Sequence, residues 1–582
     1  MCRWCARSDI ADRLTARISP SRRQFLGYTA SLAVMGPGLA ARAATGVADT
    51  IFHKGPIYPM TAPGAKVEAI ALQKGAVLAA GSSADVMALA GPTTKTIDLS
   101  GRTLLPGFID PHNHATLSAL VEMLLTNVGF STYRTKADAL AAMKAVAAKT
   151  APGDWIAFGF YDNLLQGGDI SMADLDAVSS TSPVFLMYVN GHVGAGNALA
   201  FARAKVTADI GTLPGGGFFG RGADGKLNGM IYNEPALLRF LDLAVARPNA
   251  ESLARAIGAY ARQASASGLT ALHEPGTVKP EWVEMLAKLS NSLPVRLSAS
   301  FSTDMVEASK AFAKLGPSHK ARRLPDSRFS LYGMKFWADG SNQAETAAQT
   351  QPYLRSSARG ALGYTPQQAA DLCGKARDAG WTILVHCQGD AAVDQVLDAI
   401  ETAYGAHSSL GLNRIEHATM ARPDQIDRMK RLGCEASYMT DFVYLYGAAY
   451  RDQIFGEPRA SFMVPVGAAA RAGMGYSMHT DNPAAGLPLN PLRLVQTVVT
   501  RRCVTDGSVV GPDLRMSVEE ALLGITKHAA RHIGLDDAIG TLEAGKEADL
   551  TILETDPFVA DPERLAAIRV SETWLAGEKA FG

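Results

Sequence analysis

The chain has 582 residues, of which 47% are hydrophobic and 19% are charged, and its 56 Lys and Arg residues are balanced by 56 Asp and Glu residues. This length exceeds one small domain, and the composition is that of an ordinary globular protein. The formal net charge is zero, whereas nucleic-acid-binding proteins usually have an excess of basic residues, so we expect no nucleic-acid partner.

Residues 1–43 are expected to be an export signal. Arg22 and Arg23 precede an apolar stretch that closes with Ala-Arg-Ala at 41–43, a small-x-small cleavage pattern. The arginine pair resembles a twin-arginine signal, which implies the twin-arginine export machinery as a partner and a periplasmic location. Gly and Pro at 36–38 interrupt the short apolar stretch, so we expect no stable membrane span. The alternative is a disordered, Ala-rich leader.

Both ends of the mature chain have the pattern of a small β-domain. Residues 44–104 read as short β-segments separated by Gly and Pro turns, and residues 541–582 have the same character. We therefore expect one small β-sandwich domain built from both chain ends.

Between these ends, over residues 105–540, apolar strand-like runs alternate with Ala-rich helical segments. Eight runs are predicted as strands, at 103–112, 269–274, 294–301, 330–340, 381–390, 414–418, 433–439 and 474–481. Repeated βα units predict an α/β fold, a (β/α)₈ TIM barrel. The long gap after the first strand predicts a large insertion at about 120–255, on the catalytic face of the barrel.

The first predicted strand ends in two histidines. In "LLPGFIDPHNHAT" (104–116), His112 and His114 are separated by one residue. Residues two apart on a strand face the same side, so both rings project into one volume, where neutral imidazoles suit a divalent cation. Taken alone, a pair of surface histidines in a turn is the alternative.

Four more residues of metal-binding type lie on the predicted strands. Lys335 lies within the fourth strand, and His386, His417 and Asp481 end the fifth, sixth and eighth. Active sites of such barrels lie at the carboxyl ends of the strands. We therefore expect these residues and the histidine pair to hold one or two divalent metal ions, with zinc the best match to nitrogen and oxygen ligands.

Motifs from about residue 50 to the end resemble the amidohydrolase superfamily, specifically its family 3 branch, which contains the N-substituted formamide deformylases. The resemblance lies in "LLPGFIDPHNH", "NGHVGAGNALA" (190–200), "MKFWADGS", "VHCQGD", "RIEHA" and the closing "GTLEAGKEADLTIL". These motifs are specific for the family and much less so for the substrate.

The resemblance implies a role for each metal-binding residue. His112 and His114 would bind one metal, His386 and His417 would bind a second, and a carboxylated Lys335 would bridge the two. An ammonium beside divalent cations suffers like-charge repulsion, whereas a carbamate formed from neutral lysine and CO₂ offers an anionic oxygen. The alternative is that Lys335 packs without binding metal and that a single ion is present.

The resemblance also implies a reaction. Asp481 would contact the metal and act as general base. The metal lowers the pKa of bound water from about 15.7 to near 7, and the resulting hydroxide attacks a carbonyl. Asp481 would take the proton and pass it to the departing amine. His192, from the insertion, would donate to the developing oxyanion, or else it anchors the insertion through a hydrogen bond.

Some positions depart from the family pattern. Glu274 follows His273 in "GLTALHEP", and His479 and Thr480 stand in "MHTDNP" where relatives often have Gly-Ser. These changes bear on the substrate more than on the chemistry. The aromatic segment "SYMTDFVYLYGAAY" (437–450) either lines an apolar substrate pocket or packs a loop.

The sequence therefore predicts metal-dependent hydrolysis of a carbon–nitrogen bond in a small amide or N-substituted formamide. The substrate is expected to be apolar or aromatic. An ester or lactone hydrolase is one alternative. A cyclic-amidine deaminase is another, although such enzymes usually carry a glutamate where this chain has Gly389. A non-catalytic binding protein would be favoured by loss of a ligand, but all six are present. The oligomeric state is left open, a homo-oligomer included.

Overall fold

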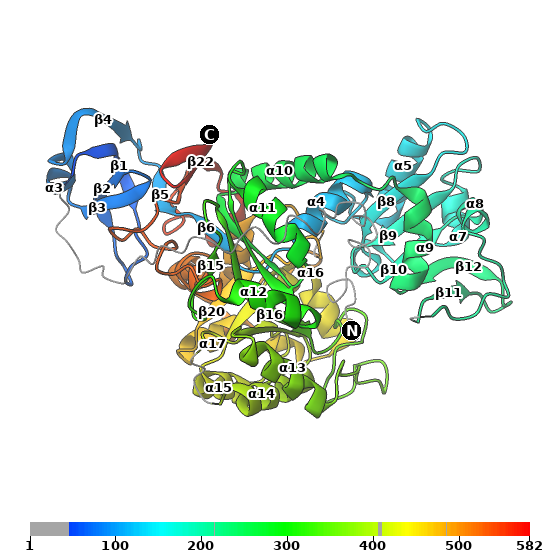
Figure 1. Ribbon diagram of the computed structural model, residues 1–582. Coiled ribbons are helices and arrows are strands. Elements are labelled where there is room, and N and C mark those ends of the chain that lie inside the picture. The colour runs from blue at the N-terminus through cyan, green and yellow to red at the C-terminus, as the bar shows by residue number, and fades with distance from the viewer. Residues whose placement is uncertain (1–45, 215, 406–409, 485) are drawn as a thin grey trace.

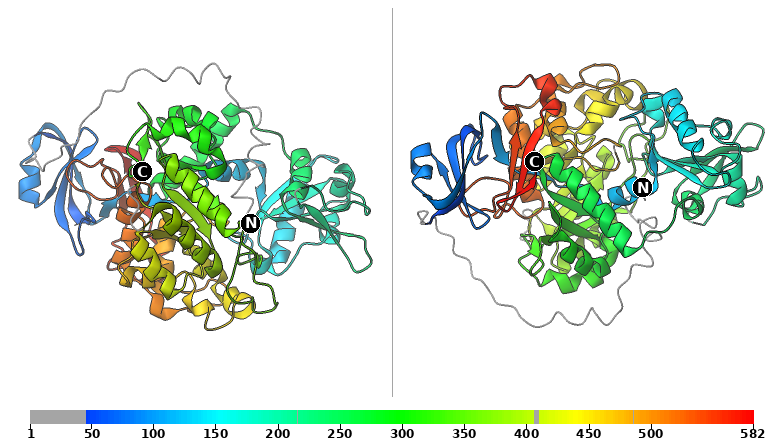
Figure 2. Two further views of the ribbon diagram at one scale, coloured as in Figure 1. Left: turned by 60° about the horizontal axis from the view of Figure 1, so that its bottom comes forward. Right: turned by 90° about the horizontal axis from the view of Figure 1, so that it is seen from above.

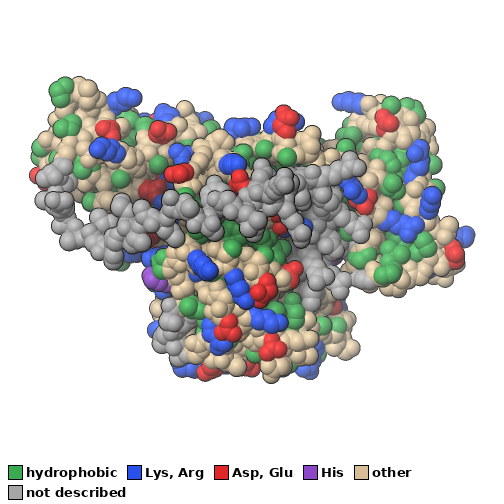
Figure 3. Space-filling model, viewed as in Figure 1, with side chains coloured by type: hydrophobic (Ala, Val, Ile, Leu, Met, Phe, Trp, Pro, Cys, Tyr) green, Lys and Arg blue, Asp and Glu red, His purple; other side chains and the backbone are tan. Residues whose placement is uncertain are grey.

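The computed structural model describes residues 46–214, 216–405, 410–484 and 486–582 (Figure 1). The predicted export signal lies outside these residues. Within them, no helix has both the length and the apolar character needed to cross a membrane. On the face seen in Figure 3, basic and acidic side chains are interspersed rather than segregated.

A barrel sheet of parallel strands forms the centre of the molecule. Its strands, in order around the sheet, are β6 (Phe108–Asp110), β13 (Leu269–Pro275), β14 (Arg296–Ser302), β16 (Phe329–Trp337), β17 (Ile383–Cys387), β18 (Arg414–His417), β19 (Glu435–Met439) and β20 (Tyr476–His479). The short β15 (Arg322–Arg323) pairs antiparallel with β16. Each of the eight expected runs contributes a strand to this sheet, which confirms the (β/α)₈ barrel. The run 103–112 does so only through β6, because its first part forms β5 (Thr103–Pro106) in another sheet.

Helices follow the barrel strands and cover their outer surface (Figures 1 and 2). They include α11 (Val283–Ser290), α12 (Val306–Ala313), α13 (Pro366–Asp378), α14 (Asp390–Tyr404), α15 (Pro423–Leu432), α16 (Asp441–Ala449), α17 (Val466–Arg471), α18 (Pro491–Thr500), α19 (Val518–Gly524) and α20 (Lys527–His532). Most of the large apolar core of the molecule lies between these helices and the strands.

The seam between β6 and β20 is closed by the loops that follow these strands. The backbone N–H of Asp481 donates to the carbonyl of His112 at 3.0 Å, and the N–H of His114 donates to the carbonyl of Asn482 at 3.0 Å. These bonds bring the histidine pair, which follows β6 rather than ending the strand as expected, beside the aspartate that follows β20.

The interior of the barrel is polar. Tyr476 and Met478 on β20 face the outer apolar core, whereas the alternating Ser477 and His479 face inward and are buried. Branched aliphatic residues normally fill such barrels. The polar interior of this barrel therefore differs from the aliphatic filling that is usual.

Strands from both chain ends share one sheet, blue and red in Figure 2. They are β1 (Ala48–Ile57), β2 (Val67–Gln73), β3 (Ala76–Gly81), β4 (Ala90–Asp98) and β5 (Thr103–Pro106), then β21 (Leu550–Leu553), β22 (Val570–Leu575) and β23 (Glu578–Phe581). The ends join where β5 pairs antiparallel with β21. The two-layered sandwich expected from the sequence stays a prediction.

The segment between β6 and β13 contains a separate sheet, cyan in Figure 1. Its strands are β7 (Thr126–Asn127), β8 (Ile156–Tyr161), β9 (Val184–Tyr188), β10 (Val193–Gly196), β11 (Phe218–Arg221) and β12 (Leu227–Tyr232). Helices α4 (Ala115–Leu124) and α10 (Ala250–Ala266) connect this sheet to the barrel. Apolar clusters on the sheet give this part of the chain a core of its own.

Candidate metal centre

The predicted ligands meet at the carboxyl end of the barrel. The Nε2 atoms of His112 and His114 lie 3.2 and 3.3 Å from Oδ1 of Asp481. The Nζ atom of Lys335, on β16, lies 3.4 Å from Nε2 of His112. Each of these four residues is at most 4% exposed, so the cluster is shielded from bulk water.

His386 and His417, at the ends of β17 and β18, complete the cluster. Their ring centroids are 4.6 Å apart, and that of His417 lies 4.8 Å from that of His112. Nε2 of His386 donates to the carbonyl of Gly340 at 2.9 Å, so Nδ1 is the ring nitrogen that keeps a lone pair. The structure thus brings together all six residues expected to bind metal.

The protonation states suit metal ligands. Burial and the charge of Lys335 lower the pKa of His112 well below its ordinary value, and burial does the same for His417. Burial alone would raise the pKa of Asp481, but the neighbouring His112 and His114 hold it well below its ordinary value. The neutral imidazoles of His112 and His417 therefore lie beside an ionised carboxylate.

The donor set fits a divalent cation. Two groups have ligand atoms within 4.8 Å of one another: His112 with His114 and Asp481, and His112 with His417 and His479. Nε2 of His114 and Oδ1 of Asp481 are buried without a hydrogen-bond partner among the described residues. Buried polar atoms are normally satisfied, so a cation among these nitrogen and oxygen donors accounts for both the convergence and the unsatisfied atoms.

Sequence reasoning missed Glu416. Its Oε2 atom accepts a hydrogen bond from Nδ1 of His112 at 2.5 Å, and its Oε1 atom accepts one from Nε of Arg414 at 2.5 Å. Burial alone would raise the pKa of Glu416, but the charges of Arg414 and Lys335 hold it below its ordinary value. The available signal was "RIEH", because two opposite charges two apart on a buried strand must face the barrel interior together.

Asp110 was also missed, although it stands in the first motif. It accepts from Oγ1 of Thr480 at 2.6 Å and from Nδ2 of Asn113 at 2.9 Å. Burial raises its pKa to about 6. The residue ties the first strand to the loop after the eighth, directly behind the histidine pair, and this explains the use of a hydroxyl side chain at position 480.

Two other residues considered from the sequence lie elsewhere. His192 is half-buried in the turn between β9 and β10, where its backbone N–H donates to the side chain of Asn190 at 2.9 Å. Within the described ranges, no hydrogen bond, ion pair or ring contact joins its side chain to the cluster. Glu274 accepts from the backbone N–H and the hydroxyl of Thr116 at 2.9 and 2.7 Å. It therefore anchors the start of α4, just after His114.

A pocket opens over the cluster, between the barrel and the insertion. Its walls combine an acidic and polar part with an apolar part, and they include Asp162, Leu164, Val189, Asn190, Ser341, Gln343, His386, Gln388, Phe442, Tyr446 and Asp481. Phe442 and Tyr446 of the aromatic segment line it, whereas Tyr438 is buried in the outer core and Tyr444 packs against that core. The expectation that this segment packs a loop is therefore wrong, because it forms strand β19 and helix α16, and the helix brings two of its rings to the pocket.

A (β/α)₈ barrel with a buried histidine and aspartate cluster at the carboxyl ends of its strands defines a class of barrel hydrolases. Residues 95–581 match the model of the amidohydrolase family. Because this match covers most of the chain, the protein belongs to the amidohydrolase family, in its family 3 branch, and is a hydrolase acting on carbon–nitrogen bonds. This confirms the resemblance seen in the sequence.

Individual relatives agree with this assignment. The chain is 26% identical to the N-substituted formamide deformylase of Arthrobacter pascens over 88% of this chain and 94% of that protein. It is 26% identical to the putative amidohydrolase YtcJ of Bacillus subtilis over 91% and 98%. A solved structure of an uncharacterised metal-dependent hydrolase from Pyrococcus furiosus shares the fold, with a TM-score of 0.67 at 23% identity over 88% of this chain and 99% of that one.

Proposed function

We propose that this protein is a metal-dependent hydrolase of small amides, and that N-substituted formamides are its substrates. The main support for a metal-dependent mechanism is that Nε2 of His112 and Nε2 of His114 both approach Oδ1 of Asp481. All three residues are buried at the carboxyl end of the barrel. The similarity to the deformylase of Arthrobacter pascens supports the choice of formamides.

The residues divide the chemical work. A divalent cation, most consistent with zinc, supplies Lewis-acid polarisation of the carbonyl and acidifies the attacking water. Asp481 is ionised, accepts the proton of that water and returns it to the departing nitrogen. Lys335, in carboxylated form, would help the histidines and Asp481 to hold the metal by supplying an anionic oxygen ligand. His192, beside the pocket residue Asn190, is the proposed donor to the oxyanion.

The walls of the pocket support an apolar or aromatic substituent on the substrate nitrogen. Phe442 and Tyr446 present rings on one side, and Leu164 and Val189 present aliphatic surface from the insertion. Polar groups such as Gln388 suit the orientation of an amide. The same attack on an ester or lactone carbonyl is the second function to test.

The test is a metal analysis together with a substrate screen. We expect elemental analysis of purified protein to find about two metals per chain, and a value near one with full activity would identify a single-metal site. We expect turnover of N-substituted formamides above that of N-acyl amino acids and lactones. Turnover of lactones alone would overturn the amide assignment, and a chain that binds no metal would overturn the metal-dependent one.

A further inference from the structure

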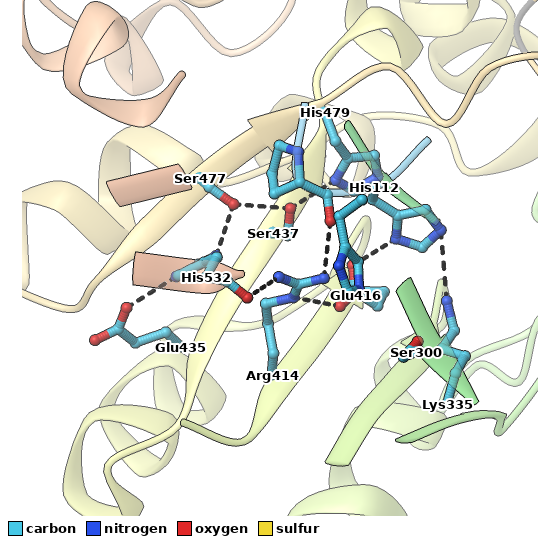
Figure 4. A network of polar contacts seen from close by, with 12 residues as sticks. His112, Ser300, Lys335, Arg414, Glu416, Glu435, Ser437, Ser477, His479 and His532 are labelled. Carbon is cyan, nitrogen blue, oxygen red and sulfur yellow. Dashed lines mark hydrogen bonds and ion pairs between the residues drawn. The ribbon is translucent and has the colours of Figure 1, made fainter. Parts of the chain in front are cut away.

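The barrel interior beneath the metal centre contains a continuous chain of buried hydrogen bonds (Figure 4). It leads away from His417 toward the opposite end of the barrel. The residues of this chain, in order, are His417, His479, Ser437, Ser477, His532 and Glu435. None of them was needed for the proposed reaction except His417.

The acceptor end of the chain determines the direction of its hydrogen bonds. Burial alone would raise the pKa of Glu435, but the hydrogen bond from His532 and the charge of Arg531 hold it below its ordinary value, so it accepts only. Nε2 of His532 therefore donates to it at 2.8 Å. Burial keeps His532 neutral, so its Nδ1 accepts the hydroxyl proton of Ser477 at 2.6 Å.

The same direction continues upward to the metal centre. Because a hydroxyl donates one hydrogen bond, Ser477 accepts from Ser437, whose Oγ atom is 2.8 Å away. Ser437 then accepts Nδ1–H of His479 at 2.7 Å. Nε2 of His479 keeps a lone pair and accepts Nδ1–H of His417 at 3.1 Å. The remaining nitrogen of His417, Nε2, is left with its lone pair.

A second, shorter branch of hydrogen bonds determines which nitrogen of His112 keeps its lone pair. Its Nδ1 donates to the carboxylate of Glu416, which leaves the lone pair on Nε2, the atom that faces Asp481. Arg414 donates to Glu416 and also to the backbone carbonyl of His532, so the two branches meet (Figure 4). Both branches thus end on a carboxylate, which is buried in Glu416 and partly buried in Glu435.

We propose that this buried network is a positioning device that fixes the tautomers of His112 and His417, so that each ring keeps its lone pair on Nε2 and can bind a metal through that atom. The inference rests on the proposed function, because it assumes that these rings bind a metal. Partners of the non-ligating nitrogen orient histidine ligands in metal sites generally, and their loss costs about 10–100-fold in metal affinity. Here Glu435 acts on His417 through four intervening side chains.

Ser437→Ala tests the long branch. It removes the link between His479 and Ser477, so His479 is free to take the other tautomer and donate Nε2–H to His417. We expect the zinc dissociation constant, measured by chelator competition, to rise about 10–100-fold. We also expect the visible spectrum of the cobalt(II)-loaded protein to change. Ser437→Thr keeps the hydroxyl and should restore both measurements.

Ser298→Ala is the matched control. Ser298, on β14, is a buried serine whose Oγ atom lies 2.9 Å from Nδ1 of His273, outside the network. Its loss removes the same kind of bond from the same barrel and should leave the zinc dissociation constant unchanged. Should Ser437→Ala fail to fold, as judged by circular dichroism, Ser477→Ala breaks the chain one bond further from the metal.

Equal zinc affinities of folded Ser437→Ala and Ser298→Ala proteins would overturn the inference. So would a Ser437→Thr protein as impaired as Ser437→Ala. Absence of zinc binding by the unaltered protein would instead contradict the proposed function, so the two failures are distinguishable.

Discussion

Asp481 has two tasks that one substitution separates. Asp481→Asn keeps an oxygen for the metal but cannot accept a proton. We expect it to retain much of its metal while turnover falls by about 10²–10⁴, the usual contribution of a positioned acid–base group. The loss should appear mainly in kcat rather than in KM, measured with elemental analysis of the same sample.

Near-normal turnover of the metal-bound Asp481→Asn protein would contradict this role. His479 would then be the first alternative base to test, because its Nε2 atom lies 3.1 Å from Nδ1 of His417 in the cluster. Glu274 is a weaker alternative, because it already accepts two hydrogen bonds from Thr116.

Lys335 has a different role, so its loss should have a different signature. Lys335→Ala removes the proposed bridging group from a buried position 3.4 Å from His112, and we expect metal and activity to be lost together. Acetate should restore part of both, because its oxygens stand in for those of the carbamate. A variant that keeps its metal content and activity would show that Lys335 is a packing residue.

At the scale of elements, helix α16 joins the barrel to the insertion. The hydroxyl of Tyr446 donates at 2.5 Å to Oδ2 of Asp162, whose Oδ1 atom caps the short helix α6 (Asn163–Gln166). Burial raises the pKa of Asp162, so this carboxyl group depends on its hydrogen bonds. The contact holds the insertion against the pocket.

Tyr446→Phe should therefore loosen the insertion. Leaving a buried acceptor without its partner costs about 1–3 kcal/mol, so we expect a lower free energy of unfolding in urea and faster proteolytic cleavage within residues 126–232. Tyr444→Phe, on the same helix and away from the pocket, is the control. Equal stability of the two variants would show that the contact does not hold the insertion.

At the scale of the whole molecule, the buried Arg296 joins the barrel to the sheet of the chain ends, because it pairs with both Asp549 and Glu547. Nε and Nη2 of Arg296, on β14, donate to Asp549 at 2.7 and 2.9 Å, next to β21. Arg296→Leu leaves that buried carboxylate without its cation, and we expect a loss of about 3–5 kcal/mol in the free energy of unfolding.

Arg323→Leu provides the comparison for this ion pair. The exposed Arg323 pairs with the half-buried Glu547, which keeps its second cation, Arg296, when Arg323 is replaced. Pairs near the surface contribute about 0–1 kcal/mol. Urea unfolding of both proteins checks the difference. A similar small effect of the two substitutions would show that the Arg296 pair does not hold the two parts together.

Export concerns the chain as a whole, and we propose it from the paired arginines. Replacing both Arg22 and Arg23 with lysine should trap the precursor in the cytoplasm, because the export receptor reads the arginine pair. Cell fractionation and immunoblotting would measure this. Unchanged periplasmic accumulation would contradict the proposal.

The sequence by itself determined the barrel, its eight strands and the six residues of the cluster. These follow from local patterns, because apolar runs mark buried strands and a polar residue at the end of such a run falls at the carboxyl edge of the barrel. The insertion was also evident, as a long gap between the first two strands.

Only the tertiary structure decided how the cluster is supported. Glu416 meets His112 across 304 residues of sequence, and Glu435 reaches His417 only through the side chains of three barrel and helix segments. Such contacts depend on which strands become neighbours when the barrel closes and on the layer that each inward side chain occupies. Neither is encoded in a local pattern, so a buried network of this kind becomes visible only in three dimensions.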